Sequence, residues 1–315
     1  MIWNKKVLIR GLSIGMTVLT ITGTGLLAGC TVKENPNAPT DRPKPIEQVD
    51  IQSKILSDFD ALLASNPKTD AIIEFIDKNI SSMSKENAVM MISKLEEGQK
   101  KDLPKLEEKY YSEAIQAELQ KIYKPGFDLN KLDEIQAAEL KDLLTETRDM
   151  GYKIETAEGT YFPVMNYEFY KKYSGNVTED IKQYIELMAV ESNETPIKDA
   201  ALTIGWDEII DRALAQEQFI KSYASSAKVD AIKELQKRYL TFILYGSNNT
   251  PLFSYETKVM KEEAKTTYTT AVKDNQDSET MQMLGKYLEI LSKTDYKFSD
   301  TADQFRKDVV EKGIF

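Results

Sequence analysis

The sequence of 315 residues contains no histidine and only one cysteine, and it has just six arginines. Without histidine the chain can form no Ser-His-Asp triad, no histidine-ligated metal site and no ordinary switch near neutral pH. With one cysteine it can form no internal disulfide, so the hydrophobic core must stabilise the fold unaided. We therefore expect no metal and no other cofactor, and we assign no catalytic residue.

Acidic residues outnumber basic ones. The chain has 51 Asp and Glu against 41 Lys and Arg, and its formal net charge is −10. A surface of this sign repels the phosphates of nucleic acids and the head groups of anionic lipids. We therefore expect no nucleic-acid partner. The predominance of lysine among the basic residues is typical of Gram-positive sources, which is an association and not a physical argument.

The start of the chain has the order of a secretory signal peptide. A positive segment within residues 1–10 precedes an uncharged, mostly apolar run from Gly11 to Leu27. The small residues Ala28 and Gly29 then lead to Cys30. In such a signal the positive end stays in the cytoplasm, so everything after Cys30 is expected outside the cell.

The sequence Leu27-Ala28-Gly29-Cys30 resembles the lipobox of bacterial lipoproteins, a resemblance that covers about the first thirty residues. It implies transfer of diacylglycerol to the Cys30 sulfur and cleavage between Gly29 and Cys30. Two acyl chains would hold the protein stably at the outer face of the cell membrane, so membrane lipid is its first expected partner. The alternative is an uncleaved membrane helix, for which Gly11 to Leu27 is at the short limit.

Cleavage at this point divides the chain into four parts. Residues 1–29 are the expected signal peptide, and residues 30–48 are the lipidated cysteine and a polar tether whose four prolines favour an extended chain. Residues 49–150 are expected to form an N-terminal helical part, and residues 151–315 a mainly helical C-terminal part. We place the boundary near Met150, where the texture of the sequence changes.

Apolar residues recur at spacings of three and four along most of residues 49–315, which predicts amphipathic helices. Ser84 is a suitable N-cap for one of them. Another is expected to begin at Asp128 or Asn130 and to end at Gly151. The resulting fold class is mainly α, a multi-helix, bundle-like extracytoplasmic domain.

One small β-hairpin is expected near residues 152–164. Apolar and polar residues alternate from Tyr152, and Glu158-Gly159 can form the turn. The returning strand contains Pro163, which lacks an N–H group and so belongs on a sheet edge. An extended partner could add a strand at such an edge.

Aromatic residues gather around this hairpin, and two interpretations remain open. Either the rings fill the core where helices meet the hairpin, which is the commoner case, or they form a binding surface whose hydroxyls recognise a partner. We nominate Tyr161, Glu155 and Glu158 as the candidate ligand or partner surface. Phe162 and Tyr170 are expected to be structural, with Tyr161 more exposed.

A second aromatic group runs from Tyr239 to Tyr255 and brackets the polar sequence Asn248-Asn249-Thr250. The same two interpretations apply to it. Packing is again the favoured one, because apolar residues at structural spacing usually belong to a core.

These observations favour a non-enzymatic binding or scaffold protein at the cell surface, with a cell-wall component or another protein as its partner. The alternative is a cell-wall-directed hydrolase that uses Asp and Glu carboxylates. A pocket lined with converging carboxylates would favour the hydrolase, and an exposed apolar patch would favour the scaffold. A two-lobed solute-binding protein is disfavoured, because strands and helices do not alternate.

Overall fold

The structure is a computed structural model that describes residues 45 to 313, so the lipobox residues Gly29 and Cys30 and most of the tether lie outside the described residues. Its first helices are α1 (Pro45–Ala64), α2 (Thr69–Asn79), α3 (Lys85–Tyr110), α4 (Glu113–Ile122), α5 (Ala138–Asp149) and α6 (Tyr167–Tyr170). The others are α7 (Glu179–Asn193), α8 (Trp206–Ser222), α9 (Val229–Tyr245), α10 (Glu262–Asp274), α11 (Glu279–Ser292) and α12 (Asp300–Lys312).

Strands are few in the described part of the chain. An antiparallel hairpin joins β1 (Tyr152–Ala157) to β2 (Thr160–Met165), and a shorter one joins β3 (Ile197–Lys198) to β4 (Ala201–Leu202). Two single 3-10 turns, η1 (Ile80–Ser82) and η2 (Lys171–Tyr173), complete the elements. The prediction of a mainly α, multi-helix domain is therefore confirmed.

The hairpin β1–β2 has the predicted position and turn. Its register pairs Tyr152 with Met165 and Ile154 with Pro163. Glu158 and Gly159 at the tip both have positive φ. The second hairpin was not predicted, because its turn residues Asp199 and Ala200 also have positive φ although neither is glycine. Such a turn carries no clear sequence signal.

Two helix boundaries differ from the predictions. Helix α1 begins at Pro45, inside the residues assigned to the tether, and proline suits the first turn of a helix because its missing N–H is not needed there. The helix expected from Asp128 or Asn130 begins only at Ala138. The Asp128 carboxylate instead accepts a hydrogen bond from the Asn130 amide N–H at 3.0 Å, a local turn that competes with helix formation.

Other helix ends follow the sequence as predicted. The Ser84 hydroxyl accepts a hydrogen bond from the Asn87 amide at the start of α3. Gly151 follows α5 with φ of 74°, and its N–H donates to the Arg148 carbonyl. A side chain at Gly151 would collide with Gln99, so this position requires glycine for conformation and for space.

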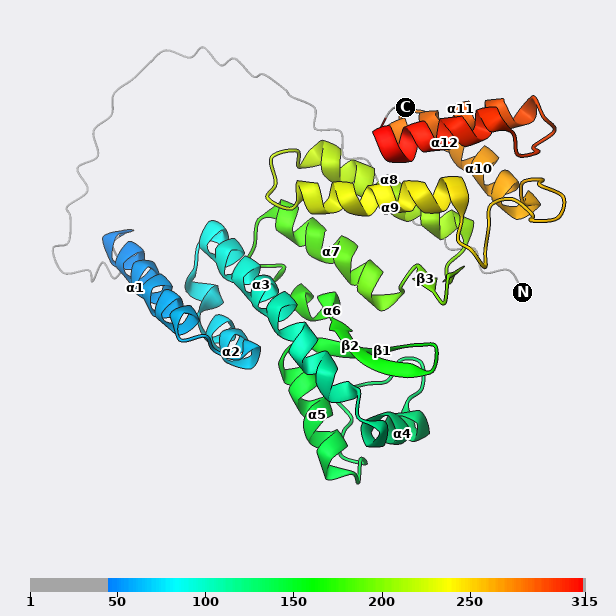
Figure 1. Cartoon of the computed structure of the whole chain (residues 1–315). Coiled ribbons are helices and arrows are strands. Elements are labelled where there is room, and N and C mark those ends of the chain that lie inside the picture. Colours follow the sequence, from blue (N-terminus) through cyan, green and yellow to red (C-terminus); the bar gives the residue numbers. More distant parts are fainter. Residues whose placement is uncertain (1–44, 314–315) are drawn as a thin grey trace, which may run out of the picture. The chain divides into compact units, whose positions relative to one another are not determined.

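Residues from Pro45 onward form one compact unit with two hydrophobic clusters. The larger cluster includes α1, α2 and the first part of α3 and then most of the chain from α6 to α12. The smaller one joins the end of α3 to α4, α5 and β1. Leu144 and Ile154 both belong to the smaller cluster, so the boundary expected near Met150 lies inside it. Figure 1 shows the hairpin β1–β2 beside α3, with α8 and α9 packed side by side.

Candidate functional site

The structure places two of the three residues nominated from the sequence close together. The Glu155 carboxylate pairs with the Lys198 ammonium at 2.6 Å and accepts a hydrogen bond from the Tyr123 hydroxyl at 3.4 Å. The ring of Tyr161 packs against the ring of Tyr123, with centroids 5.0 Å apart. Glu158 is exposed at the hairpin tip. The structure thus brings Glu155 and Tyr161 together around Tyr123, and their role as a partner surface stays a prediction.

Tyr161 and Phe162 are both half-buried, so the expected greater exposure of Tyr161 stays a prediction, but the two rings pack differently. Tyr161 is half-buried and packs against the smaller hydrophobic cluster, whereas the half-buried Phe162 belongs to neither cluster. Consecutive strand residues point to opposite faces, so only one of the two rings can face α4 and α5. Tyr170, in contrast, is 1% exposed and structural as expected.

Strand addition at β2 is also disfavoured. The side-chain amide of Gln116 on α4 donates to the Tyr161 carbonyl at 2.7 Å and accepts from the Tyr161 N–H at 2.9 Å. It therefore occupies the backbone groups that an added strand would need. Pro163 removes one more donor, and β2 packs against α3.

Four tyrosines around the hairpin converge on two polar residues of α3. The Glu96 carboxylate accepts hydrogen bonds from the hydroxyls of Tyr167 and Tyr184, each at 2.7 Å. Gln99 accepts from the Tyr170 hydroxyl through its side chain and from the Tyr152 hydroxyl through its carbonyl. We call these six residues the tyrosine network. The network consists of Glu96, Gln99, Tyr152, Tyr167, Tyr170 and Tyr184. Every tyrosine hydroxyl in it has a partner, so these tyrosines form part of the core.

The charge of Glu96 is stabilised inside this network. Burial alone would raise the pKa of Glu96, but the attraction of Lys228 and hydrogen bonds from Lys100, Lys228 and Tyr184 outweigh it and hold the pKa at about 2. A carboxylate that stays ionised at every physiological pH cannot serve as a general acid. Glu96 is therefore a structural anion.

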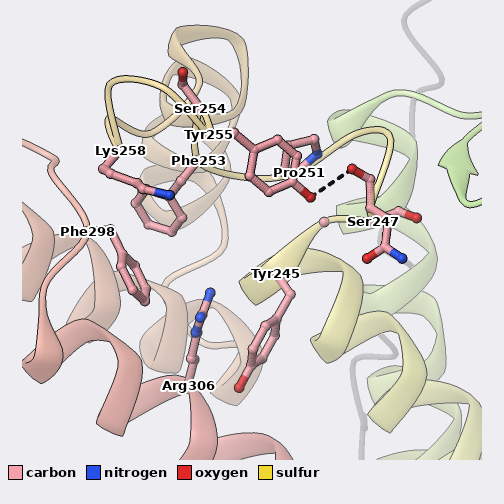
Figure 2. A pocket seen from close by; sticks show the side chains of 11 residues that line it. Tyr245, Ser247, Pro251, Phe253, Ser254, Tyr255, Lys258, Phe298 and Arg306 are labelled. Atoms are coloured by element: carbon pink, nitrogen blue, oxygen red, sulfur yellow. Dashed lines mark hydrogen bonds between the residues drawn. The ribbon is translucent and has the colours of Figure 1, made fainter.

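The second aromatic group is divided between the core and a pocket. Tyr239, Phe242 and Phe253 are buried in the larger hydrophobic cluster, as the packing interpretation predicts. A cavity of about 270 Å³ opens where α9 ends, and its walls come from Tyr245, the loop that follows it, and the approach to and first turns of α12. Figure 2 shows four rings around this space together with two cationic side chains. We call it the aromatic pocket; the rings are those of Tyr245, Phe253, Tyr255 and Phe298, and the cations are Lys258 and Arg306.

The loop that builds the pocket is fixed by its backbone. Gly246 has φ of 73°, and a β-carbon there would lie 2.3 Å from the Thr250 carbonyl oxygen, so only glycine fits. Ser247 and Thr250 exchange two backbone hydrogen bonds of 2.9 and 3.0 Å. The Asn249 N–H donates to the Ala200 carbonyl at 2.8 Å, which ties this turn to the β3–β4 hairpin. The pocket thus has a rigid wall.

Lys258 stands in the left-handed region with φ of 58°, which costs a side-chain-bearing residue of order 1–3 kcal/mol. Two backbone hydrogen bonds hold it there. Its N–H donates to the Ser254 carbonyl at 2.9 Å, and its carbonyl accepts from the Phe298 N–H at 2.8 Å. This strain places an exposed ammonium group on the rim of the pocket.

Arg306 lies between two aromatic rings. Its guanidinium carbon is 4.1 Å from the centroid of Tyr245 and 4.4 Å from that of Phe298, as Figure 2 shows. The Asp303 carboxylate accepts a hydrogen bond from Nε at 2.8 Å and contacts Nη2 at 2.7 Å. Among residues 45 to 313, no hydrogen-bond acceptor is found for Nη1. The guanidinium plane is therefore fixed through Nε and Nη2, and Nη1 is the nitrogen that no protein acceptor among the described residues engages.

A second cavity, of about 370 Å³, lies between α8 and α10 and is acidic. Asp207, Asp211 and Asp274 line it together with three threonines. Burial and, after it, the charges of Glu208 and Asp207 raise the pKa of Asp211. Within the described residues no set of three or more His, Cys, Asp or Glu side chains is arranged to hold a metal ion.

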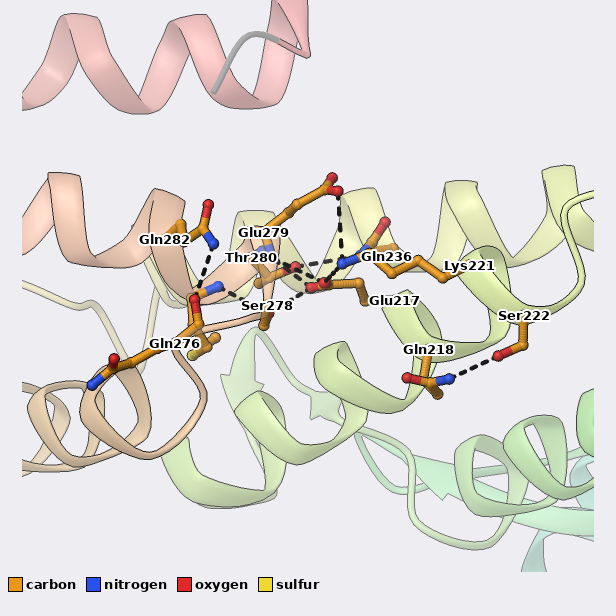
Figure 3. A network of polar contacts seen from close by, with 11 residues as sticks. Glu217, Gln218, Lys221, Ser222, Gln236, Gln276, Ser278, Glu279, Thr280 and Gln282 are labelled. Carbon is orange, nitrogen blue, oxygen red and sulfur yellow. Dashed lines mark hydrogen bonds and ion pairs between the residues drawn. The ribbon is translucent and has the colours of Figure 1, made fainter. Parts of the chain in front are cut away.

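Other carboxylates connect helices. Glu217 on α8 accepts hydrogen bonds from the Ser278 hydroxyl at 2.7 Å and from the backbone N–H groups of Glu279 and Thr280 at 2.9 and 3.0 Å, as Figure 3 shows. These donors form the start of α11, where a helix favours a negative charge. Burial would raise the pKa of Glu217, but hydrogen bonds from Lys221, Ser278 and Thr280 lower it to about 2.

The residues from 45 to 313 include no helix with the length and apolar character needed to cross a bilayer. Their large exposed hydrophobic side chains are Ile51, Tyr111, Val190 and Tyr255, which belong to four separate segments. Comparison with protein-family models, with curated proteins and with solved structures finds no match.

The packing interpretation holds for Tyr239, Phe242 and Phe253. The pocket beside them, and the roles of Lys258, Phe298 and Arg306 in it, were not predicted. The available signal was the polar sequence Asn248-Asn249-Thr250 inside an aromatic group. A polar loop within an apolar group is typical of a concave surface that meets solvent.

Proposed function

We propose that this chain is a lipid-anchored, non-enzymatic binding protein at the outer face of the cell membrane, and that the aromatic pocket is its ligand site. The observation that carries the proposal is the pocket itself. It is a concave site with a fixed backbone, four rings and two cations, and Tyr255 at its edge is 64% exposed. Ligand sites commonly combine aromatic walls with a few placed polar groups.

The chemistry of the pocket supports binding without catalysis. Its lining contains no carboxylate, and its charged groups are the two cations Lys258 and Arg306. It therefore lacks a pair of groups that could act as general acid and general base. The anchor at Cys30 would hold the pocket outside the cell, where a cell-wall component or a protein could reach it.

A photocrosslinking side chain placed at Tyr255 in intact cells tests the ligand site. The matched control is the same side chain at Tyr111, which is 63% exposed and lies at the end of α3, outside the pocket. We expect a defined adduct from position 255 that position 111 does not give. Adducts that are the same at both positions, or absent at both, would contradict a binding role for the pocket.

The anchor has its own test. Cys30→Ala should release the protein from the membrane or leave an uncleaved precursor, because the variant has no sulfur to accept the diacylglyceryl group. Mass spectrometry of the wild-type membrane fraction should find a modified N-terminal Cys30. An unmodified chain starting at Met1 would show that the lipobox interpretation is wrong.

A cell-wall hydrolase is the second candidate, and the acidic cavity between α8 and α10 is the observation that favours it. Asp211, with its raised pKa, is the group there best suited to act as a general acid. If this cavity is catalytic, Asp211→Asn should abolish the release of soluble fragments from purified cell walls. If the wild-type chain releases none, the hydrolase candidate is excluded for that substrate.

A further inference from the structure

We infer that the aromatic pocket takes a carboxylate-bearing sugar ring. This rests on the proposed binding function and goes beyond it by naming the class of ligand. The first observation is the sign of the local charge. The chain carries a net charge of −10, yet the charged residues that line the pocket are Lys258 and Arg306. An acidic protein that presents cations in a cavity selects for an anion there.

The geometry of Arg306 favours a carboxylate. Its plane is clamped by Tyr245 and Phe298, and Asp303 occupies Nε and Nη2 while Nη1 is left over. A carboxylate that reaches Nη1 would receive a charge-assisted hydrogen bond from a donor that is already oriented, so little conformational entropy is lost on binding. Asp303 also contacts Lys307 at 2.6 Å and is itself held in place.

The remaining walls favour a sugar over a purely aromatic acid. The exposed ring of Tyr255 offers a flat apolar face, and its hydroxyl donates to the Asn248 carbonyl at 2.8 Å, which fixes the ring at the mouth of the pocket. The exposed side chain of Asn248 supplies an amide group on the same lining, whereas the Ser254 hydroxyl already accepts hydrogen bonds from the Glu256 and Thr257 N–H groups. A sugar ring has apolar C–H faces for the aromatic wall and hydroxyls that can pair with this amide, whereas an aromatic acid has no hydroxyl to offer it.

The size of the cavity limits the ligand to about one ring. Its volume of about 270 Å³ is just below the roughly 300 Å³ at which small-molecule sites usually begin. The pocket therefore suits the terminal or side unit of a glycan. The rest of the glycan would extend outward past Tyr255.

Calorimetric titration of the full-length chain in detergent micelles with three probes tests this inference. Glucuronate carries the carboxylate and the sugar ring, glucose carries the ring alone, and benzoate carries the carboxylate on an aromatic ring. We expect glucuronate to bind at least about tenfold more tightly than the other two, and its binding to weaken with added salt. Equal binding of glucose, tighter binding of benzoate, or no binding of glucuronate would overturn the inference.

Variants locate the interaction. Arg306→Gln should weaken glucuronate binding about tenfold to a hundredfold through loss of a charge-assisted hydrogen bond. Arg238→Gln is the matched control, because Arg238 is exposed on α9, does not line the pocket and gives the same change of charge. Equal effects of the two variants would overturn the assignment.

Lys258→Gly is a second variant, which tests the inference even if the Arg306→Gln chain fails to fold. Glycine adopts the φ of 58° at this position freely, so the melting temperature should stay level or rise. Glucuronate binding should still weaken about two- to fivefold, as expected for one exposed cation. An unchanged affinity in a folded Lys258→Gly chain would count against the inference.

The outcomes also separate the inference from the proposed function. If crosslinking from position 255 captures a defined partner but glucuronate does not bind, the sugar assignment fails and the binding function stands. If glucuronate binds with the expected dependence on Arg306 but position 255 gives no specific adduct in cells, the pocket binds the sugar class and the cellular binding role fails.

Discussion

The tyrosine network and the aromatic pocket are both built from aromatic side chains, but they differ in the polar groups that meet the rings and in access to solvent. In the tyrosine network, four hydroxyls meet the buried acceptors of Glu96 and Gln99, and the rings belong to the core or pack against it. In the aromatic pocket, the rings surround a cavity and face Lys258 and Arg306. Acceptors on α3 satisfy the hydroxyls of the network, whereas the pocket is a cavity at the end of α9.

The difference shows what decides the role of a tyrosine-rich segment. A buried hydroxyl without a partner costs about 1–3 kcal/mol, so a buried tyrosine usually lies beside an acceptor. Tyr287 is an exception here, because its buried hydroxyl has no partner among the described residues. Glu96 and Gln99 lie three residues apart on α3 and therefore present both acceptors on one face of the helix. In the pocket, Phe253 belongs to the larger cluster, Tyr245 and Phe298 are half-buried, and Tyr255 is largely exposed.

Removing the central anion should produce the largest effect. Glu96→Ala leaves Lys228 and two tyrosine hydroxyls buried without their partner, and should lower the free energy of unfolding by about 3–5 kcal/mol. Urea denaturation measures this loss. Glu97→Ala is the matched control. Glu97 is the next residue in the sequence and its side chain is 65% exposed, so its removal should lower the free energy of unfolding by less than about 0.5 kcal/mol.

Deleting one ring from each group compares the two regions directly. Tyr170→Ala should cost about 3–5 kcal/mol, because the ring is fully buried. Tyr255→Ala should change the free energy of unfolding by less than about 0.5 kcal/mol, because that ring is 64% exposed. Chemical denaturation of both variants measures the two losses of stability. A large loss for Tyr255→Ala would mean that the pocket wall is part of the core.

Acid should weaken the network. The folded-state pKa of Glu96 is about 2 against an ordinary value of 4.5, so its stabilisation is fully present above about pH 4.5 and is lost as the pH falls towards 2. The loss is about 3 kcal/mol. The free energy of unfolding measured in urea between pH 5 and pH 2 should fall more steeply for the wild type than for Glu96→Gln. Parallel curves would show that Glu96 is not the titrating group.

The smallest effect concerns the hairpin. Tyr161→Ala should cost about 1–3 kcal/mol, because its ring packs against Tyr123 in the smaller cluster. Phe162→Ala should cost less, since Phe162 belongs to neither cluster. Denaturation of the two variants side by side tests the order. Equal large losses would leave no part of this hairpin surface free for a partner.

The succession of helices could be read from the sequence because it depends on local periodicity. Ser84 and Gly151 mark helix ends where they were expected. The segment from Asp128 to Ala137 could not be read in this way. Its apolar residues follow a helical spacing, and Leu132 is buried, but the Asp128 side chain turns the backbone before a helix can form.

The site was harder to predict, because it depends on residues far apart in the chain. Arg306 and Tyr245 are separated by 61 residues and meet only when α12 packs against α9. Neither residue type nor local spacing indicates such a contact. In the same way, no local feature of Gln116 shows that its side chain covers the edge of β2.

The sequence by itself determined the helical class of the domain, the position of the hairpin β1–β2, and the absence of disulfides and of histidine chemistry. These follow from residue types and from periods of two and 3.6, which act over a few neighbouring residues. Only the tertiary structure decided which aromatic rings became core and which line a pocket. That choice depends on whether side chains far away in the sequence, such as Glu96 and Gln99, accept hydrogen bonds from the tyrosine hydroxyls. Contacts of this kind cannot be read from local residue patterns.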